Sequence, residues 1–165
     1  MTPWSRRLPE ERSLLNPGFC AKLLWHSALG YAGVDAGGLS FEEAFLVLPF
    51  VLHSKTREAL PRDTRTSLAV WLENNPLARG QIATRARLLV PFTKEGMLFG
   101  GVYGFIQIRE GRVYANEAWK QAVNLSLKAS GDGVRRCAKR AEFLGKWFAQ
   151  AGSATTILTL MGVRP

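Results

Sequence analysis

The segment 44–52 constrains the fold more than any other part of the chain, because it is apolar on every face of a helix. It follows a capping box, in which the Ser40 hydroxyl accepts a hydrogen bond from the Glu43 amide and the Glu43 carboxylate accepts one from the Ser40 amide. A helix that is hydrophobic all round is buried. We therefore predict a central buried helix here, with Pro49 kinking it or ending its regular part.

The amino-terminal part of the chain predicts one helix and one flexible link. Asn16 offers a side-chain acceptor to the free amides of a helix start, and Pro17 suits the first turn, so a helix should run from there to about Leu29. Closely spaced glycines then predict a flexible connector: Gly30, Gly33, Gly37 and Gly38. Residues 1–13 show no periodic pattern, so we expect an N-terminal arm that orders only on binding, followed by a single domain over 14–165.

Two more helices are predicted in the middle of the chain. Asp63 should cap a helix that reaches about Asn74, with Leu68, Trp71 and Leu72 as its buried face. From Leu77 a further helical pattern begins, and Pro91 should kink or split it.

The stretch 105–115 changes to a period of two, with Glu110-Gly111 as a turn between β-branched and aromatic runs. It is the one strand pair that the sequence clearly predicts. Because two strands alone are marginally stable, the hairpin must pack on the helices. The predicted fold class is therefore mainly α, of the α+β kind: a compact helical domain with one β-hairpin, laid out like a winged-helix domain.

The carboxyl-terminal part predicts an amphipathic helix over 134–148, with apolar residues at spacings of three and four. Its other faces are basic, with Glu142 as the exception. Ser153 should cap a last short helix over 154–161, and Gly162 should end it.

The chain carries 22 Lys and Arg residues against 13 Asp and Glu, a net charge of +9, which favours a polyanion or an acidic protein surface as partner. The alternative is that the charge only keeps a small protein soluble, with helix 134–148 presenting a solvated face. The candidate nucleic-acid-binding residues are Arg79, Arg85, Arg87, Arg109, Arg112, Arg135, Arg136, Lys139 and Arg140. Against sequence-specific DNA binding, residues 88–92 are apolar where a base-reading helix carries polar side chains.

No pattern of catalytic residues is visible. His26 and His53 have no nucleophile or carboxylate at a spacing that specifies a catalytic arrangement, and Gly100–Gly104 does not continue into a phosphate-binding Gly-Lys-Ser/Thr. Cys20 and Cys137 predict neither a metal site nor a disulfide framework, which fits a reducing compartment. No stretch is apolar enough to span a membrane. We therefore expect a cytoplasmic protein that is not an enzyme and holds no cofactor or metal.

Three parts of the chain resemble a known family: Leu14–Ala21 with Leu23–Trp25, then 44–57 with Leu60-Pro61, and the ending Phe143–Ala149 with Gly162–Pro165. They resemble the middle component, third type, of bacterial ABC-three-component systems, which is otherwise catalogued as a domain of unknown function. The resemblance implies a non-catalytic adaptor beside a large ATPase similar to the SMC and Rad50 proteins. It also implies a role in anti-phage or anti-plasmid defence, similar in plan to Lamassu.

The resemblance adds His53, Arg57 and Arg164 to the candidate sites as motif positions. Trp4 beside Arg6 and Arg7 is a candidate anchor, since aromatic residues often carry interface energy. The candidate partner-binding residues are Trp4, Arg6, Arg7, His53, Lys55, Arg57 and Arg164.

The leading hypothesis is an adaptor that bridges the SMC/Rad50-like ATPase to an effector, such as a nuclease, or to double-stranded DNA. No membrane is expected as a partner. The second is a free-standing winged-helix DNA-binding regulator. The third is an enzyme centred on His53 and Arg57.

Overall fold

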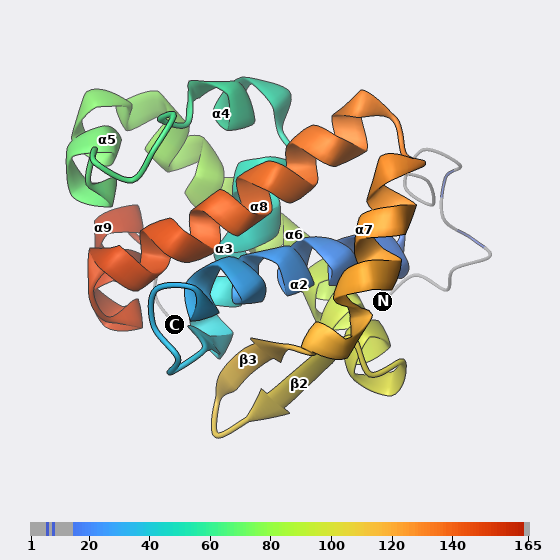
Figure 1. The fold of residues 1–165 in the computed structure, drawn as a ribbon. Coiled ribbons are helices and arrows are strands. Elements are labelled where there is room, and N and C mark those ends of the chain that lie inside the picture. Colours follow the sequence, from blue (N-terminus) through green and yellow to red (C-terminus); the bar gives the residue numbers. More distant parts are fainter. Residues whose placement is uncertain (1–5, 7, 9–14, 164–165) are drawn as a thin grey trace.

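The computed structural model describes residues 6, 8 and 15–163, and it confirms a mainly α fold with a β-hairpin (Figure 1). The elements are α2 (Pro17–Ala32), β1 (Leu39–Ser40), α3 (Phe41–Val51), α4 (Ser54–Ala59), α5 (Leu68–Asn74), α6 (Pro76–Val102), β2 (Ile106–Arg109), β3 (Arg112–Ala115), the 3-10 turn η2 (Glu117–Trp119), α7 (Lys120–Lys128), α8 (Asp132–Ala151) and α9 (Ala154–Met161).

Helix α2 begins as predicted but ends later. The Asn16 carboxamide oxygen accepts hydrogen bonds from the Gly18 and Phe19 amides, at 2.8 and 3.2 Å. The expected break at Gly30 is wrong, because that glycine lies inside the helix and lets α8 approach closely. A Cβ added at Gly30 would lie 2.0 Å from the Glu142 carbonyl oxygen, so α2 and α8 pack side by side almost backbone to backbone (Figure 1).

Helix α3 is the predicted central helix, and its capping box is present. The Ser40 amide donates to the Glu43 carboxylate at 2.8 Å, and the Glu43 amide donates to the Ser40 hydroxyl at 3.1 Å. Its apolar side chains belong to the core, among them Leu46, Val47, Leu48 and Phe50. Pro49 lies inside the helix, which ends at Val51, in agreement with a regular part that stops near the proline.

The segment 53–74 differs from the prediction at its start. Residues 54–59, for which no helix was predicted, form the short helix α4. Asp63 caps no helix, because its carboxylate binds the backbone and guanidinium of Arg65, and Ser67 caps α5. The predicted buried face of α5 is confirmed: Leu68, Trp71 and Leu72 are buried.

Helix α6 is continuous from Pro76 to Val102, so the expected split at Pro91 is wrong. Pro91 removes the amide that would donate to the Arg87 carbonyl. Both residues lie on the exposed side of the helix, where water can solvate that carbonyl.

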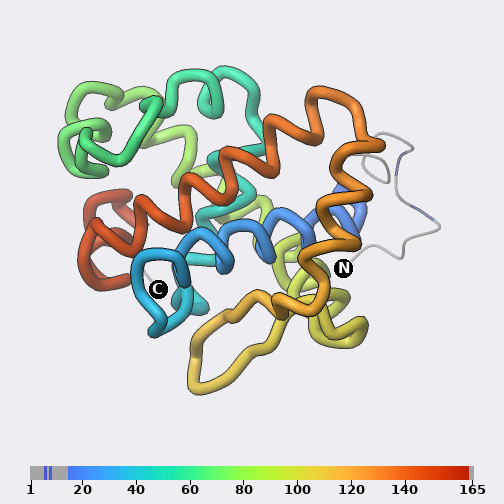
Figure 2. Tube along the Cα trace, in the orientation of Figure 1, coloured from blue at the N-terminus to red at the C-terminus, as the bar shows by residue number. Residues whose placement is uncertain are grey.

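The hairpin is confirmed, and a third strand joins it. Glu110 and Gly111 both have positive φ, 50° and 69°, as a two-residue turn between twisted strands requires. Strand β1 pairs antiparallel with β3, Leu39 opposite Val113, so the sheet order is β1-β3-β2. The sequence did not predict β1, because two residues are too few to show a period. Figure 2 shows the hairpin at the bottom of the fold, away from α4 and α5 at the top.

The carboxyl-terminal helices α8 and α9 are confirmed, the second between the predicted Ser153 cap and a left-handed Gly162. Helix α7 was not predicted. Its buried residue is Val123.

Candidate partner interface

The short helix α4 is held by a chain of hydrogen bonds that starts at its cap. The His53 Nδ1 atom accepts from the Thr56 amide at 3.3 Å and lies 3.0 Å from the Thr56 hydroxyl. That hydroxyl accepts from the Arg85 guanidinium of α6 at 2.8 Å. Burial, and then the charges of Arg85, Lys55 and Arg57, lower the pKa of His53, so the neutral imidazole is favoured as a cap.

Arg57 is the buried cation of this region, with 9% of its surface exposed. Its guanidinium donates to the carbonyl of Val51, the last residue of α3, at 2.7 Å and contacts the Cys137 sulfur at 3.4 Å. No carboxylate of the described residues forms an ion pair with it. Burial raises the pKa of Cys137, opposed by Arg57 and Arg136, so the thiol stays protonated. Arg57 therefore joins α3, α4 and α8.

The segment between α4 and α5 is tied down by long-range hydrogen bonds to its backbone carbonyls. The Trp71 indole donates to Ala59 at 2.9 Å, the Trp147 indole to Thr66 at 2.7 Å, and the Arg140 guanidinium to Pro61 at 2.8 Å. The Arg140 guanidinium also lies 5.5 Å from the centre of the Phe143 ring. The bonds from Arg140 and Trp147 hold the 60–67 segment against α8, and the bond from Trp71 joins α5 to the last residue of α4.

Between α4, this segment and α8 lies a cleft of about 550 Å³, here named the basic cleft. Its lining holds five basic side chains and one acidic one: Arg57, Arg62, Arg136, Lys139, Arg140 and Glu58, with the Phe143 ring beside them. Arg62, Arg136 and Lys139 are exposed, whereas Arg57 and Arg140 are fixed by the contacts above. The cleft thus offers exposed cations over a hydrogen-bonded floor, a surface that attracts carboxylates or phosphates.

The structure brings together four residues that the sequence analysis placed in two groups. Arg57 was a candidate for protein contact, whereas Arg136, Lys139 and Arg140 were candidates for nucleic acid. Arg62 was missed, because it lies in a loop without a pattern and reaches the cleft only through the fold.

The remaining nucleic-acid candidates do not gather at one place. Arg79 and Arg87 are exposed on α6, whereas Arg109 is exposed on the hairpin and lies 4.8 Å over the Tyr114 ring. Arg112 donates to the Gly38 carbonyl at 3.1 Å, which ties β3 to the glycine-rich link.

Arg135 donates to backbone carbonyls at the end of α7 and pairs with Asp132, so it joins α7 to α8. Of the partner candidates, Lys55 and Arg6 are exposed. Trp4, Arg7 and Arg164 lie outside the described residues.

The described residues hold no group of three His, Cys, Asp or Glu side chains that could bind a metal ion. Within the same residues, no helix is long and apolar enough to cross a membrane. His26 and His53 lie apart, the first buried in α2 and the second at the α4 cap.

Comparison with known proteins identifies the family. The sequence model of the ABC-three component system Middle Component 3 family matches residues 4–165. The chain belongs to this family. The resemblance noted above is therefore confirmed, and a middle component implies partner subunits in an ABC-three component system.

No curated protein and no solved structure matches the chain. The winged-helix resemblance stays a prediction.

Proposed function

We propose that this chain is the non-catalytic adaptor subunit of its ABC-three component system, acting in cytoplasmic anti-phage or anti-plasmid defence. In this proposal the basic cleft binds an acidic surface of an SMC/Rad50-like ATPase subunit. The observation that carries it is the cleft itself: five cations to one carboxylate, on a floor fixed by hydrogen bonds.

The chemistry of the cleft supports a protein partner. Charge complementarity speeds encounter and selects the partner, while packing at the Phe143 ring supplies apolar contact. Exposed Arg136 and Lys139 can align with carboxylates, while buried Arg57 keeps the helices in place.

The test is co-purification of the full chain with the ABC ATPase of its system. We expect the double variant Arg136→Glu/Lys139→Glu to weaken the complex by about tenfold or more, because reversed rim charges repel an acidic surface. The matched control is Lys120→Glu/Lys128→Glu, which reverses two exposed lysines on α7, outside the cleft. Equal loss in both variants, or a wild-type chain that purifies alone beside the ATPase, would contradict the proposal.

The second candidate is a free-standing winged-helix DNA-binding regulator. The succession of α6 and the hairpin, with β1 as a third strand, favours it. Against it, α6 exposes apolar side chains where base contacts require polar ones: Leu77, Leu88, Leu98 and Val102. It requires steeply salt-dependent DNA affinity together with a specific site, and equal weak binding to every duplex would exclude it.

Bridging to an effector or to DNA is a further part of the adaptor proposal. It requires a second surface that stays open when the ATPase is bound. A reconstituted complex that recruits neither effector nor DNA would remove this part and leave the ATPase contact in place.

A further inference from the structure

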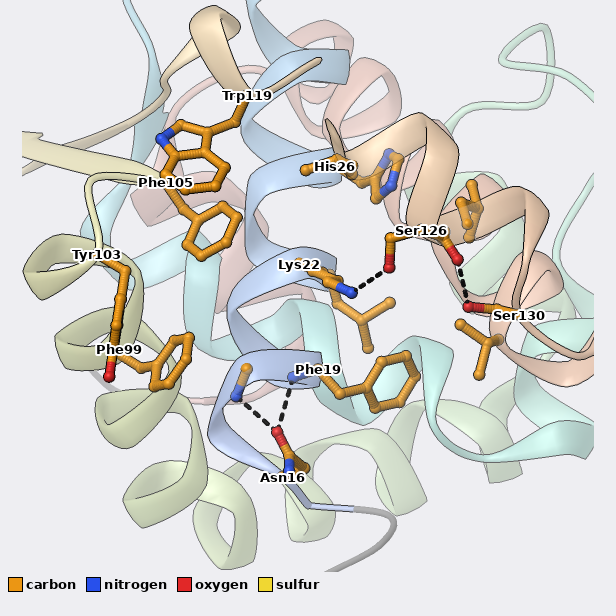
Figure 3. A pocket seen from close by; sticks show the side chains of 16 residues that line it. Asn16, Phe19, Lys22, His26, Phe99, Tyr103, Phe105, Trp119, Ser126 and Ser130 are labelled. Atoms are coloured by element: carbon orange, nitrogen blue, oxygen red, sulfur yellow. Dashed lines mark hydrogen bonds between the residues drawn. The ribbon is translucent and has the colours of Figure 1, made fainter. Parts of the chain in front are cut away.

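A groove of about 780 Å³ crosses the first half of α2, and here it is named the aromatic groove. The exposed side of α2 forms its floor. Figure 3 shows Phe99, Tyr103, Phe105 and Trp119 on one side of that helix. The other side is formed by residues of α7 and the start of α8. The groove is thus a channel over a helix.

Aromatic rings in continuous contact form the first wall. The Phe99 ring centre lies 4.4 Å from that of Tyr103 and 6.4 Å from that of Phe105, and the Phe105 ring lies 4.3 Å from the Trp119 ring. Tyr103 is 58% exposed, so the end of this stack faces solvent. A wall of this kind suits a flat or apolar side chain, since aromatic pairs gain contact energy beyond simple burial.

The wall is built by a turn that requires glycine. Helix α6 ends at Val102, and Gly104, at φ +73°, reverses the chain so that Phe105 returns beside Phe99. The Asn116 carboxamide donates to the Gly104 carbonyl at 2.8 Å and fixes this turn. The aromatic wall is therefore a rigid part of the fold.

The floor of the groove carries a positive charge close to its second side, at Lys22 of α2. Lys22 is half-buried, and its Nζ atom donates to the Ser126 hydroxyl at 2.6 Å. No carboxylate of the described residues forms an ion pair with it. The first turn of α2 holds no acidic residue, and the Asn16 carboxamide already accepts from its Gly18 and Phe19 amides. The Lys22 ammonium therefore favours an anionic group in the groove.

His26 supplies an independent sign of a missing partner. It lines the groove between α2 and α7, with 4% of its surface exposed. Neither ring nitrogen has a hydrogen-bond partner within the described part of the chain. Buried polar groups normally have partners, so an unpartnered imidazole in the wall of a groove indicates a site that a polar ligand completes.

From this combination we propose that the aromatic groove binds a short segment of a partner subunit, which places an aromatic side chain against the Tyr103–Phe99 wall and a carboxylate near Lys22. The inference deepens the adaptor proposal, because it gives the chain a second binding surface. The carboxylate matches the Lys22 ammonium, which has no ion-pair partner among the described residues, and the aromatic ring extends an existing stack.

The position of the groove suits a bridge. Val134 and Ala138 of α8 line the aromatic groove, whereas Arg136 and Arg140 line the basic cleft. At 100° per residue these pairs face opposite sides of the same helix turns. One partner can therefore occupy the cleft while another segment occupies the groove.

The test is selection of a random phage-displayed peptide library on the full-length chain, followed by affinity measurements with the enriched peptides. We expect these peptides to share an aromatic residue next to Asp or Glu. Tyr103→Ala and Lys22→Met should each lower the affinity for these peptides by about tenfold, as the loss of an interface anchor does.

The matched controls are Leu125→Ala and Lys120→Met, an exposed apolar and an exposed basic residue on the outer face of α7. They should leave the affinity within about twofold, as substitutions outside a binding patch do. Circular dichroism and thermal melting of each variant separate loss of binding from loss of folding.

Several results would overturn the inference. One is the absence of enriched peptides, and another is enrichment of peptides that lack the acidic–aromatic pair. Unchanged affinity in Tyr103→Ala would also overturn it. So would displacement of bound peptide by a mononucleotide or by a synthetic peptide of residues 1–13, since each gives the groove a different occupant.

The outcome is separable from that of the adaptor proposal. If the ATPase co-purifies but no peptide binds the groove, this inference fails and the contact at the basic cleft stands. If the ATPase does not co-purify, the adaptor proposal fails, whereas a selected peptide still reports on the groove.

Discussion

The basic cleft and the aromatic groove lie on opposite sides of the first turns of α8, and they differ in how they would gain affinity. The cleft presents exposed cations, such as Lys139, over a floor held by Arg57. The groove presents stacked rings around one half-buried ammonium, that of Lys22. Exposed charges steer and select, whereas desolvated rings supply contact energy. The comparison shows one helix supporting two surfaces of different chemistry.

The largest effect is expected from a substitution between α2 and α8, which should disrupt both the basic cleft and the aromatic groove. A Cβ at Gly145 would lie 1.8 Å from the Ser27 carbonyl oxygen, so Gly145→Ala forces α8 away from α2. We expect the free energy of unfolding to fall by about 3 kcal/mol or more, with loss of both binding activities. Chemical denaturation measures it.

Gly133→Ala is the control for this substitution. It lies in the same helix, and a Cβ there meets no atom within 4 Å. It should stabilise the chain slightly, by about 0.5 to 1 kcal/mol, because alanine favours a helix. Similar losses at both glycines would show that the α2–α8 contact does not decide stability.

The second prediction is that binding at the basic cleft and binding at the aromatic groove depend differently on salt concentration. Raising the salt from about 0.05 M to about 0.5 M should weaken the ATPase complex by about tenfold, since exposed cations of the basic cleft are screened. The affinity of a peptide for the aromatic groove should fall much less, because contacts between rings are insensitive to screening by salt. Titration calorimetry at both salt levels gives the change in affinity for each surface. An equal change for both would show that the two surfaces do not differ in their dependence on charge.

The third effect concerns Asn16, which caps α2 at the end of the aromatic groove. Asn16→Ala should lower the free energy of unfolding by about 1 kcal/mol, as the loss of a helix cap does. Asn16→Asp should leave the free energy of unfolding unchanged, because aspartate also caps a helix. It should nevertheless lower the affinity for an acidic peptide, because the two carboxylates repel each other. Binding at the basic cleft should not change in either variant. Equal destabilisation by alanine and aspartate would refute this account.

The smallest expected effect is a pH dependence from His26. Burial lowers its pKa below the ordinary 6.5, with Glu142 raising it and Lys22 lowering it to a lesser extent. As the pH falls below 6.5, the unfolded chain binds the proton more readily than the folded chain. This histidine's contribution to stability is therefore complete above 6.5 and is lost as the pH falls through the folded pKa.

The measurement compares wild type with His26→Phe between about pH 7 and about pH 5, the range in which histidine titrates. We expect a smaller decrease in the free energy of unfolding for the variant. An identical decrease would show that His26 does not contribute to the pH dependence.

Local signals in the sequence predicted most of the secondary structure. The caps at Asn16, Ser40 and Ser153 were readable, because each hydrogen bond joins residues two or three positions apart. The hairpin turn at Glu110 and Gly111 was readable for the same reason. Pro91 misled the prediction, since its cost depends on whether the freed carbonyl faces water.

The candidate sites were only partly predictable. The basic residues of α8 were visible as a helix face, whereas Arg62 and the aromatic groove carried no local signal. Phe99, Phe105 and Trp119 come from α6, the start of the hairpin and η2, and only the turn at Gly104 brings them together.

The sequence by itself determined a basic, mainly helical chain with capped helices and one hairpin, because these follow from contacts between near neighbours. The tertiary structure decided which cations share a cleft, which rings form a wall and why Gly30 and Gly145 are glycines. Those features depend on contacts between residues far apart in the chain, such as Arg140 with Pro61 and Arg57 with Cys137. Such contacts are set by packing, and no short stretch of sequence specifies them.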